Sequence, residues 1–297
     1  MAVVAEPPQQ PDLREPAGWR RRSNRIATVL MVLAFVLAII PLGFVLFTVI
    51  AKGASIISWS FLTSGIPPQF EPASVGGIGP AVLGTIEITA LATVIAVPLG
   101  ILGAVYLNEY GGNGVLARVI GFMSDVMTGV PSIVMGLFIF SIWTLHFGLS
   151  GLGGALALGC LMLPIVIRSS DEMLKLVPDP LREASYALGA TKARVTMTVV
   201  LPAALGGIVS GSLLAVARAA GETAPLLFTI GAAHLVATNV FSGANTSLPS
   251  QIFSNATQPY PGAQGRAWGA ALTLIVMAFA LMVVARFVTA RFTRYSR

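Results

Sequence analysis

The sequence contains very little cysteine and histidine. One cysteine, Cys160, occurs among 297 residues, so no disulfide can form within the chain. Because Cys160 lies in an apolar run, we expect its thiol to pack as a small hydrophobic group. The two histidines, His146 and His234, have no second ligand at metal-site spacing, and we therefore expect no metal site.

Charged residues are also scarce. They make up 10% of the chain, against about 25% in soluble domains, while hydrophobic residues make up 55%. A soluble protein of this size needs a charged surface, so the composition indicates an integral membrane protein. The net charge of +6 does not indicate a nucleic acid partner, because the basic residues form no continuous stripe.

The sequence lacks the motifs needed for catalysis. No G-x-x-x-x-G-K-[ST] phosphate-binding loop occurs, and no nucleophile is paired with a base in a plausible site. We therefore predict no catalytic residue, no cofactor bound by this chain and no enzymatic activity of its own. If the protein takes part in ATP-driven work, ATP and Mg²⁺ must bind to a partner chain.

What the chain has in abundance is long apolar runs. Six of them are long enough to cross about 30 Å of hydrocarbon as helices of roughly 20 residues each. The prediction is an all-α integral membrane protein with six transmembrane helices in one domain. The predicted spans are Ile26–Ala51, Pro80–Leu107, Val119–Phe147, Leu152–Ile167, Leu205–Ala232 and Ala267–Phe287.

The basic residues outside these spans sort to one side of the membrane. Fifteen fall on the side of the two termini and only two, Lys52 and Arg266, on the other, which predicts cytoplasmic termini. Residues 1–25 are predicted to be a disordered cytoplasmic tail, since the first 18 are rich in proline and polar groups. Residues 26–291 form the membrane domain, and residues 292–297 form a second cytoplasmic tail.

Charged residues inside spans are functional candidates, because each costs about 2.5–3.5 kcal/mol to insert. Arg218 and Glu222 are four residues apart in a predicted helix, within ion-pairing reach. Arg218 would donate several hydrogen bonds to an oxyanion, Glu222 would orient it and Thr223 would add a hydroxyl. A buried structural ion pair is the alternative. Asp125 and Glu87 are candidates for a gate or a subunit interface.

An amphipathic stretch, EASYALGATKARVTMTVVLP, separates two apolar runs between Glu183 and Pro202. The charge distribution places it in the cytoplasm. Glu183 would suit the amino-terminal dipole of a short helix, and Gly189 would permit a tight turn between two short helices. Pro202 would open the next span, which leads about 16 residues later to Arg218.

The spacing of this stretch resembles the EAA loop of ABC importer permeases, whose pattern is EAA, three residues, G, nine residues and I-x-L-P. Ser185 and Val199 stand where the family has Ala and Ile. The resemblance implies a type I ABC importer permease fold, with this loop as a cytoplasmic coupling helix that docks on the ATPase. The coupling residues that it implies are Glu183, Ala184, Gly189, Leu201 and Pro202.

From Gly76 onward, further segments resemble the phosphate-specific permeases of the A-type subunit (PstA). They include GGIGP at Gly76–Pro80, GVPSIVMGL at Gly129–Leu137 and ARAAGETAPLLFTIGAA around Arg218. The resemblance implies phosphate passage past Arg218 and Glu222 in a bacterial inner membrane. The implied partners are membrane lipid, a homologous C-type permease subunit, a cytoplasmic ATPase dimer and an extracytoplasmic phosphate-binding protein.

Other functions are compatible with the same residues. A permease for another oxyanion, such as molybdate or sulfate, would use an intramembrane arginine in the same way. A passive anion channel would use Arg218 as a selectivity residue. A membrane scaffold or sensory subunit would carry out no transport itself.

Overall fold

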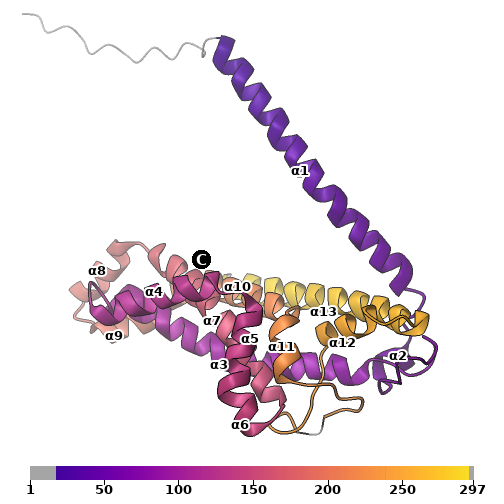
Figure 1. Cartoon of the computed structure of the whole chain (residues 1–297). Helices are drawn as coiled ribbons and strands as arrows, with labels where there is room; N and C mark the ends of the chain where they lie inside the picture. The colour runs from indigo at the N-terminus through magenta and orange to yellow at the C-terminus, as the bar shows by residue number, and fades with distance from the viewer. Residues whose placement is uncertain (1–17, 238, 294–297) are drawn as a thin grey trace, which may run out of the picture. The chain divides into compact units, whose positions relative to one another are not determined.

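The computed structural model describes residues 18–237 and 239–293 (Figure 1). These residues form helices and contain no strand, as predicted. The chain divides into two units, residues 1–48 and 49–297, which are described separately.

The first unit consists of most of helix α1 (Gly18–Gly53), whose last residues belong to the second unit. The segment Arg21–Gly53 is 33 residues long, and its most apolar stretch of 18 residues has a mean hydropathy of 3.0. At about 1.5 Å per residue, it is longer than the hydrocarbon core of a membrane. Because α1 begins at Gly18, residues 18–25 are helical, and their assignment to a disordered tail was wrong; residues 1–17 lie outside the described residues.

The second unit is a bundle of helices of very different lengths. The elements after α1 are α2 (Trp59–Thr63), α3 (Gly79–Val105), η1 (Tyr106–Tyr110), α4 (Val115–Gly129), α5 (Ser132–Ile139), η2 (Phe140–Thr144), α6 (Leu145–Phe147), α7 (Gly151–Lys175), α8 (Asp179–Ala187), α9 (Lys192–Val195), η3 (Thr196–Val200), α10 (Leu201–Ala220), α11 (Ala224–Thr229), α12 (Leu248–Ala256) and α13 (Pro261–Thr293).

Helices α3 and α7 form the centre of the bundle. They pack along one another, α10 packs on α7 and α13, and α12 packs on α13. Helices α8 and α9 lie at one end of this unit, whereas α2 and α12 lie at the other (Figure 1). The central apolar core joins α3, α7, α10 and α11 through Ile88, Leu158, Met162, Val216 and Leu226.

Each end of the bundle has its own apolar core. At the α8–α9 end, Leu174, Val195, Val200 and Ile208 pack together. At the opposite end, Phe61 of α2 packs with residues of α3, α12 and α13. The three cores follow one another along the bundle, so a shift at one end has a packed route to the other.

Five of the six predicted spans are single helices long and apolar enough to cross a membrane. The third span, predicted as Val119–Phe147, is instead a pair of helices bent by 110° between Gly129 and Ser132. Pro131 explains the break, because Val130 before it takes an extended conformation with φ −73° and ψ 129°. The bend gives the bundle either a broken span or a re-entrant segment.

Several predicted boundaries were wrong, most of all those of the fourth and fifth spans. The fourth span continues from Ile167 to Lys175, so Arg168 and Lys175 lie on α7 and not in a loop. The fifth span runs from Lys192 to Ala220 and ends well before Ala232. The fourth span was ended at a charged residue, although the helix continues beyond it. The fifth was extended along an apolar run, although the helix ends within that run.

Pro202 lies in the first turn of α10, as predicted, but the span begins earlier, because it runs continuously from Lys192 to Ala220. The π-helical turn η3 directly precedes α10. Proline has no N–H to donate within a helix, and its ring crowds the preceding turn, so a widened turn lets the helix continue.

The contact between α5 and α11 depends on Gly136. A Cβ atom on Gly136 would lie 2.6 Å from the Cα atom of Pro225, so the two backbones approach too closely for a side chain. We expect Gly136→Ala to lower stability by about 1–3 kcal/mol through overpacking. Thermal unfolding of the purified protein in detergent measures this loss. Gly121→Ala on α4 is the control, because nothing lies within 4 Å of that position; equal melting temperatures for the two variants would contradict the packing argument.

Candidate functional site

A cavity of about 240 Å³ lies beside the break between α4 and α5. Helices α7 and α10 complete its wall, and Arg218 and Glu222 supply its charged groups. We call it the Arg218 cavity. Its lining residues are Met127, Thr128, Val130, Pro131, Ser132, Leu161, Pro164, Ile165, Arg218 and Glu222.

The end of α10 positions the two charged residues. Arg218 lies in the last turn of α10, and the N–H of Gly221 caps the helix by donating to the carbonyl of Arg218. Glu222 follows in the short break before α11, where Pro225 stands at the start of the new helix. The prediction that Arg218 and Glu222 lie within ion-pairing reach is confirmed, but Glu222 lies beyond the last residue of the helix, so the two do not share a helix face.

The two side chains form an open ion pair. Arg218 Nε lies 3.6 Å from Glu222 Oε1, which is longer than a normal hydrogen bond. The Arg218 side chain is 70% exposed and that of Glu222 is 22% exposed. Among the described residues no group accepts a hydrogen bond from Arg218. The alternative of a buried structural pair does not describe this geometry, because the guanidinium keeps its donors available.

An exposed arginine within the membrane-spanning bundle needs water or protein beside it. Contact with lipid tails would leave its charge uncompensated, at a cost of about 2.5–3.5 kcal/mol or more. The open side of Arg218 is therefore expected to face an aqueous path or a neighbouring protein. Either surrounding allows the guanidinium to bind an oxyanion through two parallel N–H groups.

Two hydroxyl groups in the cavity wall were missed in the sequence. Thr128 and Ser132 flank the Pro131 break, and Thr128 already donates to the carbonyl of Ser124 at 2.8 Å. Ser132 begins α5, so the amino-terminal turn of that helix borders the cavity. The positive end of a helix dipole favours an anion. The sequence feature that could have indicated these two hydroxyls is Pro131, a helix-breaking residue within an apolar run.

The other predicted site residues lie elsewhere. Thr223 caps α11 without a side-chain hydrogen bond and does not line the cavity. Glu87 is half-buried on α3 and also lies outside the cavity. Asp125 on α4 forms an ion pair with Arg168 on α7, so it joins two helices close to the cavity wall.

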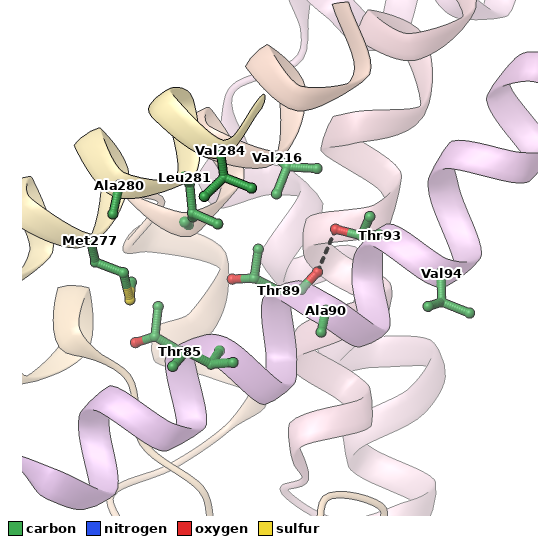
Figure 2. Close-up of a pocket in the computed structure, with 12 residues that line it drawn as sticks. Thr85, Thr89, Ala90, Thr93, Val94, Val216, Met277, Ala280, Leu281 and Val284 are labelled. Carbon is green, nitrogen blue, oxygen red and sulfur yellow. Dashed lines mark hydrogen bonds between the residues drawn. The ribbon is translucent and has the colours of Figure 1, made fainter. Parts of the chain in front are cut away.

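A larger cavity of about 490 Å³ lies between α3, α10 and α13 (Figure 2). Its polar groups are mainly threonine hydroxyls: Thr85 donates to Ala81 O and Thr93 to Thr89 O, both at 2.7 Å. The remaining wall is aliphatic, with Met277 and Leu281 from α13. It offers no charged donor, so an oxyanion would lose its hydration there without compensation. The Arg218 cavity is therefore the candidate anion site.

The segment 179–195, here called the α8–α9 loop, forms two short helices as predicted. Glu183 and Ala184 are exposed on α8, which has no buried residue. Asp179, and not Glu183, occupies the first turn of α8, so the predicted dipole role of Glu183 was wrong. Farther along, Leu201 is half-buried and Pro202 exposed.

Gly189 ends α8 in a left-handed conformation, with φ +79°. Its N–H donates to Tyr186 O at 2.9 Å, and the N–H of Ala190 donates to Ser185 O at 3.2 Å. These two bonds form a Schellman motif, which closes a helix and turns the chain sharply. The prediction of a tight turn at Gly189 is confirmed.

The chain is similar to known transport proteins. A family profile for binding-protein-dependent transport system inner membrane components matches residues 96–294. A phosphate transport system permease protein PstA 1 of Mycobacterium tuberculosis is 45% identical, over 98% of this chain and 97% of the relative. A phosphate transport system permease protein PstA of Yersinia pestis is 41% identical, over 94% of both chains.

Solved structures show the same fold at low sequence identity. A chain of a bacterial alginate ABC transporter has a TM-score of 0.62 and 13% identity, and the match covers 94% of this chain and 99% of the other. A chain of the MetNI methionine ABC transporter in an inward-facing conformation has a TM-score of 0.54 and 20% identity, covering 74% and 94%. The helical arrangement is therefore that of ABC transporter permeases, as predicted.

The turn at Gly189 provides a test of the α8–α9 loop. No atom lies within 4 Å of a Cβ placed there, so the backbone conformation alone disfavours a side chain. We expect Gly189→Val to destabilise the turn by about 1–2 kcal/mol, whereas Gly189→Asn is tolerated because asparagine adopts the left-handed region. Hydrogen exchange at the amides of residues 189 and 190 measures the effect. Equal protection in the two variants would contradict the role of the positive φ angle.

Proposed function

The chain belongs to the family of binding-protein-dependent transport system inner membrane components, and we propose that it forms half of the translocation pathway of an ATP-driven phosphate importer. The observation that carries this function is similarity along nearly the whole chain to two phosphate transport system permeases, at 45% and 41% identity. The fold and the family indicate a transporter permease, and these relatives indicate phosphate as the substrate.

In this proposal phosphate passes through the Arg218 cavity. Arg218 would bind two phosphate oxygens through its guanidinium, and the hydroxyls of Thr128 and Ser132 lie in the same wall. Glu222 would keep the arginine oriented and weaken retention of the anion by its own negative charge. A transport site needs such moderate binding, because the anion must leave as well as enter.

The energy for transport would come from partner chains. The chain has no phosphate-binding loop for ATP, and the exposed helix α8 offers a protruding surface to an ATPase. A dimeric cytoplasmic ATPase would move the α8–α9 loop, and a homologous second permease subunit would complete the pathway. An external phosphate-binding protein would deliver the substrate at the opposite end of the bundle.

The proposed orientation places both termini and the α8–α9 loop in the cytoplasm of a bacterium, with the chain in the inner membrane. The support is the uneven distribution of basic residues along the sequence. In this orientation Lys52 and Arg266 lie toward the outside. A cysteine accessibility assay with an impermeant reagent tests it. A cysteine introduced by Leu188→Cys, at a position that is 90% exposed, would react only in inside-out vesicles; reaction in right-side-out vesicles would reverse the orientation.

Uptake of radiolabelled phosphate tests the proposed function directly. In a strain lacking its own phosphate permease, expression of this chain with its partner subunits should restore ATP-dependent uptake. Uptake of radiolabelled molybdate or sulfate that unlabelled phosphate does not inhibit would indicate another oxyanion. Flux that persists without ATP hydrolysis would indicate a channel, and normal uptake in a strain deleted for this chain would indicate a non-transporting subunit.

The role of Arg218 can be tested by graded substitution. We expect Arg218→Gln to lower phosphate uptake about 10- to 100-fold, because charge-assisted hydrogen bonds contribute about 1.5–3 kcal/mol. Arg218→Lys retains the charge but loses the bidentate geometry, so an intermediate rate is expected. Arg118→Gln, at an exposed position on α4, is the matched control. Wild-type uptake by assembled Arg218→Gln complexes would contradict a role in the pathway.

A further inference from the structure

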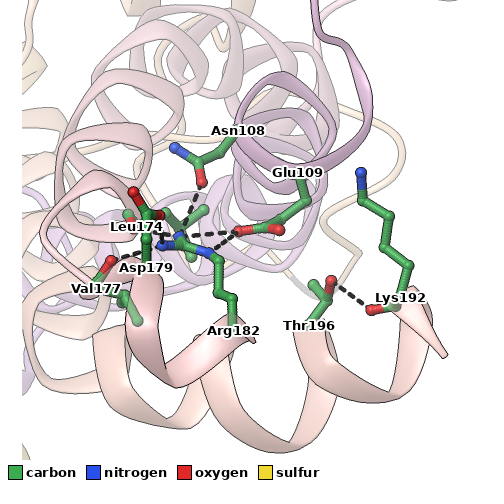
Figure 3. A network of polar contacts seen from close by, with 8 residues as sticks. All are labelled: Asn108, Glu109, Leu174, Val177, Asp179, Arg182, Lys192 and Thr196. Carbon is green, nitrogen blue, oxygen red and sulfur yellow. Dashed lines mark hydrogen bonds and ion pairs between the residues drawn. The ribbon is translucent and has the colours of Figure 1, made fainter. Parts of the chain in front are cut away.

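Arg182 on α8 is the most extensively bonded side chain at the α8–α9 end of the bundle (Figure 3). Only 14% of its side chain is exposed. Its Nη2 donates to Glu109 Oε1 at 3.1 Å and its Nε donates to the same oxygen at 3.3 Å. Glu109 is itself 5% exposed, so the pair is buried although it lies next to an exposed helix.

The same guanidinium also holds the end of α7. Nη2 donates to Leu174 O at 3.0 Å and Nη1 donates to Val177 O at 2.6 Å. These carbonyls belong to the carboxy-terminal turn of α7 and the residues just after it, where the regular helical hydrogen bonds end; Leu174 O also accepts from the N–H of Val177 at 3.2 Å. One arginine of α8 therefore fastens α8 to α7 and, through Glu109, to the end of α3.

Glu109 belongs to the π-helical turn η1, which extends α3. The neighbouring residue of this turn, Tyr110, makes a second contact with the α8–α9 loop. Lys192 Nζ of α9 lies over the Tyr110 ring, 5.3 Å from its centroid, within the range of a cation–π interaction. Consecutive residues of η1 thus hold both helices of the loop, α8 through Arg182 and α9 through Lys192.

Apolar packing makes this connection stiff. Ala104 of α3, Leu174 of α7 and Val195 of α9 are each fully buried in one cluster with Val200 of η3. Closely packed interiors transmit displacement because they have little free volume. Farther along, α7 supplies Leu161, Pro164 and Ile165 to the wall of the Arg218 cavity. Helix α7 therefore connects η1 and Arg182, at one of its ends, with the proposed substrate site.

We propose that η1 is a clamp in which Glu109 and Tyr110 act as positioning residues, transmitting movement of the α8–α9 loop to the α3–α7 pair through Arg182 and Lys192. This inference rests on the proposed function as an ATP-driven importer. It adds a non-covalent route to the covalent one through α10. With both routes, movement of the loop by the ATPase would reach α3 and α7 as well as α10.

The clamp predicts uncoupling when Glu109 or Arg182 is neutralised. We expect Glu109→Gln and Arg182→Gln to leave the complex assembled and hydrolysing ATP, while phosphate transported per ATP falls about 10-fold, as for loss of a charge-assisted hydrogen bond. The measurement uses the complete complex in proteoliposomes, with uptake and ATP hydrolysis recorded on the same sample. A merely structural role would lower both activities in proportion and leave their ratio unchanged.

Matched controls come from the same end of the bundle. Glu172→Gln on α7 and Arg118→Gln on α4 repeat the two substitutions at exposed positions and should retain the wild-type ratio. The double variant Glu109→Gln/Arg182→Gln leaves no unpaired buried charge, so it is expected to assemble even if a single variant does not. Its ratio should be no lower than that of the more affected single variant, because both changes break the Arg182–Glu109 pair and Arg182→Gln alone already removes the other bonds of the guanidinium.

The cation–π contact has its own pair of variants. Tyr110→Phe keeps the aromatic face and should retain coupling, whereas Tyr110→Leu should lower the ratio. A wild-type ratio in both the Glu109→Gln/Arg182→Gln and Tyr110→Leu complexes would overturn the clamp. Failure of the proposed function would be visible separately, as an absence of ATP-dependent phosphate uptake by the wild-type complex.

Discussion

The packing of this largely apolar chain depends on the hydrogen bonds and ion pairs that compensate its charged side chains. Arg266, only 1% exposed, donates to the carbonyls of Pro68, Gln69, Glu71 and Pro72, all within 3.1 Å. Arg168 pairs with Asp125, and Lys175 lies 2.5 Å from Asp171. In each case a basic group joins two segments or stabilises a helix end, so compensation of charge also fixes the packing.

Arg218 differs, because its one charged neighbour is 3.6 Å away and most of its side chain is open. That difference gives the arginines separate roles. Buried arginines whose donors are occupied by carbonyls cannot bind a further anion without breaking existing bonds. Arg266 therefore holds the segment 68–72 against the first turns of α13, and Arg182 holds the ends of three helices. Of these three, Arg218 is the one whose side chain is mostly exposed, and it lies where two helices are interrupted, at Pro131 and at Gly221. Interrupted helices are tolerated at membrane depth where they border a cavity.

The sequence predicted the fold well and the site in part. Apolar runs identified the spans because their length and hydropathy need no tertiary context, and the spacing from Glu183 to Gly189 predicted the turn that the positive φ angle confirms. The sequence did not distinguish Pro131, where the chain bends by 110°, from other membrane prolines such as Pro98 and Pro164, which remain inside helices. The pairing of Arg182 with Glu109, 73 residues apart, carries no local signal. In the sequence, Arg182 is one of the fifteen basic residues on the side of the termini, and nothing in its neighbourhood indicates a packing role.

The two connections between the α8–α9 loop and the Arg218 cavity have different mechanical properties. The connection through helix α10 follows the covalent chain, but the π turn η3 just before α10 widens the helix and lets it bend there. A bend at η3 would absorb part of any movement before it reached Arg218. The contacts of Arg182 with α7 and Glu109 bypass that turn, because α7 runs without a π turn from Lys175 to the cavity wall at Ile165. If α10 bends while α7 is held rigidly beside it, the two helices slide past one another. The Arg218 cavity lies between them, so its shape would change. Opening and closing the Arg218 cavity would then need only a small sliding of α10 along α7.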